Sequence, residues 1–407
     1  MTVQEPRTRA YLDHAATCPM PEPVLHDYVE ALRAIGNPSS THGHGQIARE
    51  ALERSRETIA RALGGDPAET ILTSGGTESI NTALKGIFWS RRKAGIGPVL
   101  LIAEGQHSAT NEAAEWLESE QGAEVRWLPT DAEGVLQPAV LAAALAEEGA
   151  ERVALVSIMW ANNEVGSVWP VAELCAVAAA CGVPVHVDAV AALGQVPVDF
   201  AASGAAALSV SAHKIGGPVG IGALMLGRRT EAMSILHGGS QQRSRSGTQN
   251  AAAAVAFARA LALVTSGRAT PDPARVAHLR RLRDRIVAGV RAAVPDAVLR
   301  GSDPAGDEDR EQPRRIPANA HFTFPGCQGD SLVFLLDAAG ISASVGSACG
   351  AGVVRTSHVL RSMGIPEEEA AGALRLTVGA GTTDAEVDAL LAALPDAVAR
   401  ARAAGLS

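Results

Sequence analysis

Short runs of apolar, often β-branched residues alternate with alanine-rich stretches of helical periodicity between residues 69 and 226. This alternation limits the fold more than any other feature, because it is typical of an α/β domain with a mostly parallel, helix-covered sheet. Helices are expected between the strands, for example at Thr77–Lys93, Glu112–Gln121 and Val171–Cys181. The expected strands are Glu69–Thr73, Val99–Ala103, Val125–Leu128, Val153–Met159, Val183–Val187, Ala206–Val210 and Ala223–Leu226. Such sheets bind ligands at the carboxyl ends of their strands, so the residues after each strand are the first candidates for function.

The pattern changes beyond residue 250. A helix over Asn250–Ser266 leads out of the α/β region, and an α+β arrangement follows. Its expected elements are a helix at Pro273–Ala293, strands near Ala320–Phe324, Ile341–Ser344 and Leu374–Val378, and a last helix opened by a capping box, Thr383-x-x-Glu386. The segment Gly301–Pro317, rich in Asp, Glu, Arg and Pro, is expected to form a surface loop.

The length of the chain supports the same division. With 407 residues, 47% of them hydrophobic, the chain is too long for one ordinary core and long enough for two. We expect a large domain over residues 14–262 and a small α+β domain over residues 263–407, with residues 1–13 packing on the small domain.

Charge and cysteine content exclude several functions. The chain has 35 Lys and Arg against 44 Asp and Glu, a net charge of −9, so it carries no basic footprint for nucleic acid. It has no apolar run of membrane-spanning length and no signal-peptide apolar region near its start. Its five cysteines have neither metal-ligand nor redox spacing. We therefore expect a cytoplasmic protein in a reducing compartment, with no metal site and no membrane or nucleic-acid partner.

The strand at Glu69–Thr73 runs directly into Ser74-Gly75-Gly76-Thr77, and a helix follows. Glycines at a helix N-terminus leave backbone N–H groups free to hold an anion, which the helix dipole also favours. No Lys-Ser or Lys-Thr pair follows, so the segment is not a P-loop. Ser-Gly-Gly is also an ordinary turn, but at a strand end it predicts a phosphate site at Gly76 and Thr77.

Polar side chains follow four further strands of the expected sheet. They are His107, Asn162-Asn163-Glu164, Asp188, Ser211, His213 and Lys214. Each alone has an ordinary explanation, such as a helix cap, a turn or a buried histidine. Four glycines and a proline follow Lys214 closely and leave space for a bulky group. Together these residues fit a phosphorylated aromatic aldehyde, with Lys214 as Schiff-base lysine, Asp188 on the ring nitrogen and His107 stacked on the ring. The sequence therefore predicts pyridoxal phosphate as the cofactor.

Motifs of one family occur in order along nearly the whole chain. They are YLDHAAT (Tyr11–Thr17), GNPSSTHGHG (Gly36–Gly45), TSGGTES (Thr73–Ser79), MWANNEVG (Met159–Gly166), HVDA (His186–Ala189), SAHKIGGPVGIGAL (Ser211–Leu224), RSGT (Arg245–Thr248), SVGSACGAG (Ser344–Gly352) and LRLTVGAGTT (Leu374–Thr383). The sequence resembles the cysteine desulfurases of the class V aminotransferase type, above all the actinobacterial enzymes of iron–sulfur cluster assembly. The resemblance implies a pyridoxal-phosphate enzyme of fold type I that converts L-cysteine to L-alanine through a cysteine persulfide.

The resemblance also implies roles for single residues. Lys214 matches the Schiff-base lysine, and Arg375 matches the arginine that binds the substrate carboxylate, with Asn37 assisting. Thr248 matches a threonine that reaches the cofactor phosphate of a neighbouring subunit, which implies a homodimer. The other matches are cofactor-contacting positions: Gly76, Thr77, His107, Asn163, Asp188, Ser211 and His213. His107 can also move protons. A sulfur-accepting or scaffold protein is an expected partner.

Cys349 matches the family's nucleophile, and its neighbours in the sequence support that role. No side chain in Gly346–Gly352 is larger than its own thiol. A buried structural cysteine would usually have bulky neighbours, whereas a thiol on an open loop can reach the substrate sulfur and carry it away. Cys327 lies in a proline- and glycine-rich turn and is expected to be structural.

The sequence departs from the family near the expected site. Ala191 stands where the family has a glutamine that donates to the phenolic oxygen of the cofactor. Only Ser244 separates Arg243 from Arg245, where the family has two residues, so which arginine faces the site or a partner stays open. Gly350 follows the nucleophile where relatives have Thr or Ser. Two alternatives therefore stay open: a diverged lyase or selenocysteine-type enzyme, and a sulfur-relay partner with little activity.

Overall fold

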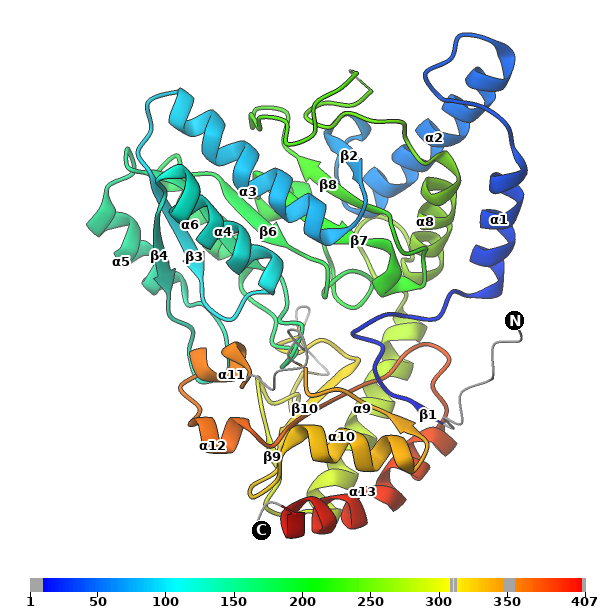
Figure 1. The fold of residues 1–407 in the computed structure, drawn as a ribbon, viewed down its shortest axis with the longest axis vertical. Helices are drawn as coiled ribbons and strands as arrows, with labels where there is room; N and C mark the ends of the chain where they lie inside the picture. Colours follow the sequence, from blue (N-terminus) through cyan, green and yellow to red (C-terminus); the bar gives the residue numbers. More distant parts are fainter. Residues whose placement is uncertain (1–9, 240, 308–309, 311–312, 347–355, 405–407) are drawn as a thin grey trace.

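The fold has two parts, which lie one above the other in Figure 1. The structure, a computed structural model, describes residues 10–239, 241–307, 310, 313–346 and 356–404. Figure 1 shows an upper part built around one large sheet and a lower part of helices around small sheets, with the N-terminal strand β1 in the lower part. Cys349 lies outside the described residues.

The large sheet has seven strands in the order β2-β8-β7-β6-β5-β3-β4. They are β2 (Thr70–Thr73), β3 (Val99–Ala103), β4 (Glu124–Leu128), β5 (Val153–Met159), β6 (Val185–Asp188), β7 (Ala207–Ser211) and β8 (Gly222–Leu226). Four of the six neighbouring pairs are parallel, and β8 runs antiparallel to β2 and β7. The predicted α/β class with a mostly parallel sheet is therefore confirmed.

Helices cover both faces of this sheet. Along β3, Leu100 and Ile102 join one hydrophobic core, whereas Leu101 and Ala103 join another, as the two-residue period of a strand requires. Burial on both faces explains why the strands are almost wholly apolar. The helices of this part are α1 (Glu22–Arg33), α2 (Gly43–Ala62), η1 (Pro67–Glu69), α3 (Gly76–Lys93), α4 (Ser108–Gln121), α5 (Pro138–Glu148), α6 (Val171–Ala180), α7 (Phe200–Ser203), η2 (Ala212–Ile215) and α8 (Ala251–Val264).

The second part has its own core and two small sheets. Its elements are β1 (Ala10–Tyr11), α9 (Pro273–Ala293), β9 (Val298–Leu299), β10 (Asn319–Thr323), α10 (Gly329–Ala338), β11 (Ile341–Ser342), α11 (His358–Ser362), α12 (Glu367–Ala370), β12 (Ala373–Thr377) and α13 (Asp384–Ala404). One sheet is antiparallel, in the order β12-β10-β9, and β1 pairs with β11 in parallel. The separate core supports the proposed boundary near residue 262.

The capping box predicted for the last helix is present. The backbone N–H of Glu386 donates to Thr383 Oγ1 at 3.3 Å, and that of Thr383 donates to Glu386 Oε2 at 2.7 Å. In the described part of the chain, no helix is both long and apolar enough to cross a membrane.

The described residues of Gly301–Pro317 form no named helix or strand, as expected of a loop, but much of this loop is buried rather than at the surface. Its described residues Ser302, Asp307 and Arg315 are buried. Arg315 donates to the backbone carbonyls of Ser302, at 2.8 Å, and Val165, at 2.7 Å, and burial lowers the pKa of Arg315 to about 9. Backbone carbonyls replace water around this charged side chain, which is why composition alone was misleading.

Candidate active site

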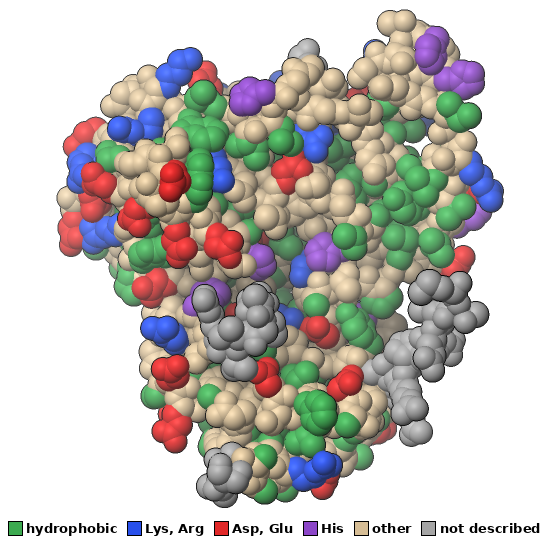
Figure 2. All heavy atoms as spheres, viewed as in Figure 1, with side chains coloured by type: hydrophobic (Ala, Val, Ile, Leu, Met, Phe, Trp, Pro, Cys, Tyr) green, Lys and Arg blue, Asp and Glu red, His purple; other side chains and the backbone are tan. Residues whose placement is uncertain are grey.

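A cavity of about 970 Å³ lies between the carboxyl edge of the large sheet and the small β12-β10-β9 sheet. Figure 2 shows histidine side chains gathered where the two parts meet. The cavity brings together most of the predicted site residues, namely Gly76, Thr77, His107, Asn163, Asp188, Ser211, His213, Lys214 and Arg375. The residues that follow β2, β3, β5, β6 and β7 thus meet at one edge of the sheet, as expected.

The start of α3 forms one end of the cavity. Gly75, with a φ of 152°, turns the chain from β2 into the helix in a conformation that other residues rarely adopt. A Cβ on Gly76 would lie 2.8 Å from Val190 Cγ2, so a side chain there would collide. The first N–H groups of α3 have no partner within the helix, and the helix dipole makes this end positive. The site can therefore hold a phosphate group, with the exposed Thr77 beside it.

Asp188 ends β6 and lies buried on the cavity wall. Its Oδ1 accepts a hydrogen bond from the Val190 N–H at 2.9 Å. Burial raises the pKa of Asp188, while the Val190 N–H and His107 lower it. It forms no salt bridge with any described residue. A buried carboxylate of this kind is suited to pair with a cationic ring nitrogen of a ligand.

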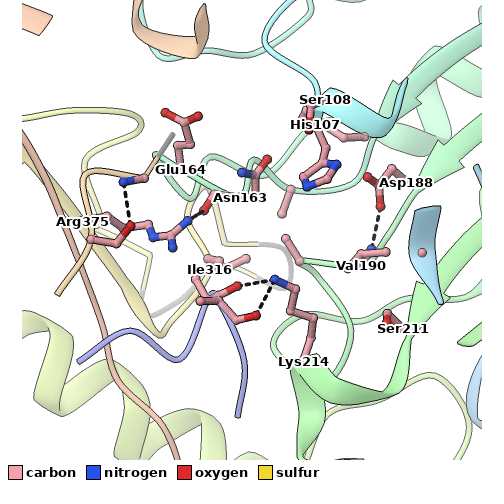
Figure 3. Close-up of a pocket in the computed structure, with 18 of the residues that line it drawn as sticks. His107, Ser108, Asn163, Glu164, Asp188, Val190, Ser211, Lys214, Ile316 and Arg375 are labelled. Carbon is pink, nitrogen blue, oxygen red and sulfur yellow. Dashed lines mark hydrogen bonds between the residues drawn. The ribbon is translucent and has the colours of Figure 1, made fainter. Parts of the chain in front are cut away.

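His107 follows β3 and caps α4. Its Nδ1 accepts from the Ala109 N–H at 3.1 Å, so the proton of the neutral ring is on Nε2. His107 is exposed to the open cavity that it lines; desolvation by the surrounding protein lowers the pKa of His107, while Asp188 raises it. Figure 3 shows the ring on the same side of the cavity as Asp188. The ring can stack on a flat ligand or move a proton.

Lys214 lies in η2, directly after β7, and its Nζ donates to the carbonyl oxygens of Ala15 and Ala16. Burial lowers the pKa of Lys214 to about 8, and the positive charge of Arg375 contributes. At pH 7 about one amine in ten is then neutral, rather than about one in three thousand at the usual pKa of 10.5. Lys214 is therefore prepared to act as a nucleophile and a base.

Arg375, on β12, lies across the cavity from Lys214 (Figure 3). Its side chain is only 6% exposed. Nη1 donates to the Asn163 carbonyl at 2.9 Å, and Nη2 forms a salt bridge with Asp13 at 2.9 Å. Nε is buried and has no hydrogen-bond partner among the described residues. Arg375 lines the cavity, and a guanidinium there is suited to bind a carboxylate.

Three predicted site residues remain, and two of them do not line this cavity. Asn37 is exposed between α1 and α2, and its Oδ1 accepts from the Ser39 N–H at 2.9 Å. Thr248 is also exposed and does not line the cavity. The third, Cys349, lies outside the described residues. The roles of all three stay predictions.

The two arginines around Ser244 have different surroundings. Arg245 forms a salt bridge with Glu78, on the first turn of α3, at 2.8 Å. Arg243 donates to backbone carbonyls, including that of Gly227 at 3.2 Å. Neither lines the cavity, but Arg245 is the one tied to the phosphate end.

Sequence reasoning noted Glu164 after a strand without giving it a role, and it missed His358. Glu164 is buried, and its Oε2 accepts from the Ser357 hydroxyl at 2.5 Å. Burial raises the pKa of Glu164. The His358 ring, on α11, donates from Nε2 to the Gln106 carbonyl at 2.6 Å. Glu164 is part of the Asn-Asn-Glu run and could have been given a role there, whereas nothing in the sequence marks His358.

A glutamine, Gln195, lies close to Ala191, the position where the family has a glutamine. Ala191 and Gln195 both line the cavity. Gln195 Nε2 donates to the Ala191 carbonyl at 3.4 Å, and its Oε1 accepts from the Ala318 N–H at 3.2 Å. Because both ends of its amide have backbone partners, Gln195 does not simply replace the absent side chain.

The family model for aminotransferase class-V matches residues 10–390. The chain therefore belongs to the aminotransferase class-V family. Within it, the relatives are cysteine desulfurases: the chain is 48% identical over 400 residues to an IscS-like cysteine desulfurase of Mycobacterium tuberculosis, covering 98% of both chains. This confirms the family resemblance.

Solved structures agree with this assignment. A NifS-like protein matches with a TM-score of 0.82 and 31% identity, covering 96% of this chain and all of that one. A structure described as SspA in complex with cysteine matches with a TM-score of 0.75 and 26% identity, covering 92% and 100%. The predicted fold type I is confirmed.

The family's cofactor is pyridoxal phosphate, and the cavity fits it. The free backbone N–H groups at the start of α3 can hold a phosphate, and Gly76 packs against Val190 where a Cβ would collide. The buried carboxylate of Asp188 suits the ring nitrogen, and Lys214 supplies an amine at the same cavity. The chain has only three lysines, Lys85, Lys93 and Lys214, and of these only Lys214 lines the cavity.

Proposed function

We propose that this protein is a pyridoxal-phosphate-dependent cysteine desulfurase that converts L-cysteine to L-alanine and carries the sulfur as a persulfide on Cys349. One observation supports this most. Lys214, with its pKa lowered to about 8, faces Arg375 across a cavity that also has a phosphate site and a buried carboxylate. An amino acid fits between them, with its amine toward Lys214 and its carboxylate toward Arg375.

When bound, pyridoxal phosphate supplies a carbonyl carbon that condenses with amines and a ring that withdraws electrons from the substrate α-carbon. Gly76, Thr77, Ser211, His213 and Asn163 would hold it. Asp188 would keep its ring nitrogen protonated, and His107 would stack on its ring and could move protons. Lys214 removes the α-proton, because a neutral amine is available near neutral pH.

The sulfur step belongs to Cys349. Its thiolate attacks the sulfur of the substrate, so that an S–S bond forms as the bond from sulfur to the β-carbon breaks. The β-carbon takes up a proton and the α-carbon regains one from Lys214, so that the organic product is L-alanine. Arg375, assisted by Asn37, holds the substrate carboxylate during this step.

The protein acts as a homodimer in this proposal. Apolar side chains more than a third exposed form a helical stripe on α1 and continue onto α2: Leu25, Val29, Leu32, Ile35 and Ile47. Figure 2 shows hydrophobic side chains over this side of the molecule. Thr248, exposed here, would then reach the phosphate site of the neighbouring subunit. The molecular mass in solution, with Leu32→Glu as the interface variant, tests this point.

A persulfide must be passed on, so the proposal includes a sulfur-accepting or scaffold protein, as in iron–sulfur cluster assembly, in the cytoplasm. L-cysteine is the proposed substrate because Arg375 binds a carboxylate and Cys349 reacts with a sulfur atom. A relative's structure with cysteine supports the same choice.

Incubation with L-cysteine and excess dithiothreitol tests the activity. We expect alanine and sulfide in equal amounts, because each turnover leaves one alanine and one sulfur that the reductant releases. If pyruvate and ammonia form in place of alanine, the protein is a lyase. If neither alanine nor pyruvate forms, the protein is a relay partner.

A further inference from the structure

The segment Asp13–Ala16, which we name the strap, crosses from one part of the molecule to the other beneath the cavity. It runs along β12, where Asp13 forms a parallel bridge with Thr377 and the Ala15 N–H donates to Thr377 Oγ1 at 2.9 Å. His14 lines the cavity, and its Nε2 lies 3.2 Å from Thr382 Oγ1. The strap is therefore held by the small domain.

At one end, the strap holds Arg375. Asp13 Oδ1 accepts from Nη2 at 2.9 Å, and the Asn163 carbonyl accepts from Nη1 at 2.9 Å. Asp13 is the only carboxylate in a salt bridge with Arg375 among the described residues. These two bonds fix the guanidinium in one orientation and leave the buried Nε without a partner.

At the other end, the strap holds Lys214. The carbonyl oxygens of Ala15 and Ala16 both accept from Nζ, the second at 3.0 Å. Arg375 disfavours the charged form of Lys214, whereas Asp13 favours it, so both lie close enough to act on the lysine. The strap thus contacts both Arg375 and Lys214, the two cations of the proposed substrate site.

We propose that Asp13 is a positioning residue that aims the Arg375 guanidinium at the substrate carboxylate. The proposal rests on the function proposed above, in which Arg375 binds that carboxylate. In this proposal Asp13 does not touch the substrate, and its effect on carboxylate binding passes through Arg375.

The physical reason is pre-organisation. A free arginine side chain has several rotatable bonds, and fixing them when a ligand binds costs affinity. The charge-assisted bond to Asp13 fixes the guanidinium plane before the substrate arrives. The hydrogen bond depends mainly on the Oδ1 acceptor, which an asparagine also offers. The orientation of the Arg375 guanidinium should therefore be kept in Asp13→Asn and lost in Asp13→Ala.

The test compares two ligands that differ only in the charge of one group. L-alanine carries a carboxylate and L-alaninamide does not, and binding of each is followed through the visible absorbance of the cofactor in the holoenzyme. In Asp13→Ala we expect the dissociation constant of L-alanine to rise by about tenfold, the effect of losing one charge-assisted hydrogen bond. L-alaninamide should bind as it does to the wild type.

Two further variants separate positioning from a general structural role. Asp13→Asn should bind L-alanine within about threefold of the wild type, because its amide oxygen can still accept from Arg375. Asp296→Ala removes a carboxylate that pairs with Arg402 at 2.7 Å, away from the cavity, and should change neither ligand. With L-cysteine, the KM of Asp13→Ala should rise more than its kcat falls, because the loss is in binding.

Three results would overturn the proposal: unchanged L-alanine binding in Asp13→Ala, equal weakening of both ligands, or no rescue by Asp13→Asn. A wild-type protein that binds neither L-alanine nor L-cysteine would instead contradict the proposed function. Thermal unfolding midpoints of all variants show whether Asp13→Ala is folded; if it is not, Asp13→Leu, which keeps a side chain of similar shape without an acceptor, takes its place with the same expected results.

Discussion

The two walls of the cavity are built in different ways. The wall of the large domain consists of residues that directly follow strands of one sheet, such as His107, Asp188 and Lys214. The opposite wall combines Arg375 in a strand of another sheet, the strap and His358 at the start of α11. The first wall is a product of sheet topology, and the second is a product of packing between distant segments.

This difference separates binding the cofactor from choosing the substrate. Parallel strands bring their carboxyl ends to one edge, so the cofactor-facing residues that follow these strands all come from the large domain. The carboxylate site requires Asp13 and Arg375, which are 362 residues apart in the sequence, to meet beside the small β12-β10-β9 sheet. Substitutions in the first wall should therefore affect the cofactor itself, and those in the second should affect the substrate.

The largest expected effect is that of Lys214→Ala. We expect the covalently bound cofactor and its visible absorbance to disappear, and desulfuration to fall by about a thousandfold or more, because nucleophile and base are lost together. Lys85→Ala and Lys93→Ala are matched controls, since they change the only other lysines. Borohydride reduction followed by peptide mapping locates the adduct, and a label on Lys85 or Lys93 would contradict the assignment.

The next largest effect is that of Cys349→Ser. Sulfide release should fall by about a hundredfold or more, because a hydroxyl group is a far weaker nucleophile than a thiolate. L-cysteine should still change the visible spectrum, since Lys214 and Arg375 remain. Cys327→Ser is the control: Cys327 is buried and burial raises the pKa of its thiol, so sulfide release should stay at the wild-type rate. Unchanged release from Cys349→Ser would exclude Cys349 as the nucleophile.

The same difference explains how much the sequence could predict. All seven strands of the large sheet were predicted to within about two residues, because burial on both faces makes them apolar and helices separate them. His107, Asp188 and Lys214 followed from their places after those strands. Arg375 came from the family resemblance alone, because no local pattern marks an arginine inside a strand.

The second wall could not be predicted for a physical reason. Asp13, Glu164 and His358 become important only through partners far away in the sequence: Arg375, Ser357 and the Gln106 carbonyl. Local periodicity says nothing about such pairs. The surface-loop prediction for Gly301–Pro317 was inaccurate for a similar reason. The buried Arg315 donates to the Val165 carbonyl, which is far away in the sequence.

A smaller effect tests whether the two walls interact. The capture of pyridoxal phosphate by the apoprotein requires the neutral amine of Lys214, so its rate should rise with pH through about 8. After burial, the charge of Arg375 is the next cause that lowers this pKa. Arg375→Gln should therefore move the midpoint upward, by about one pH unit or less, because removing a cation favours the protonated amine.

Stopped-flow absorbance across pH 6–10 measures this midpoint (about 8 in the wild type). Arg281→Gln is the control, since Arg281 pairs with Asp384 outside the cavity. An unchanged or lowered midpoint in Arg375→Gln would mean that the two walls are electrostatically independent.

The smallest effect lies within the first wall, at Ala191. An alanine side chain donates no hydrogen bond, so the phenolic oxygen of the bound cofactor lacks a donor that relatives supply. A hydrogen bond to a charged oxygen contributes about 1.5–3 kcal/mol, and a water in the same place returns part of it. Ala191→Gln should therefore favour the charged oxygen and lower the pH midpoint of the visible absorbance, by less than about one unit.

If Gln195 already donates to the phenolic oxygen, Ala191→Gln would leave the pH midpoint unchanged. Gln195 lines the cavity one turn further along, but its Nε2 already donates to the Ala191 carbonyl at 3.4 Å. Because that donor is engaged with the backbone, we expect Gln195→Ala to leave the midpoint unchanged while Ala191→Gln lowers it. Absorbance titrations of both variants and the wild type decide. A shift in Gln195→Ala with none in Ala191→Gln would mean that Gln195 has taken over the donor role and that the first wall is complete without a glutamine at position 191.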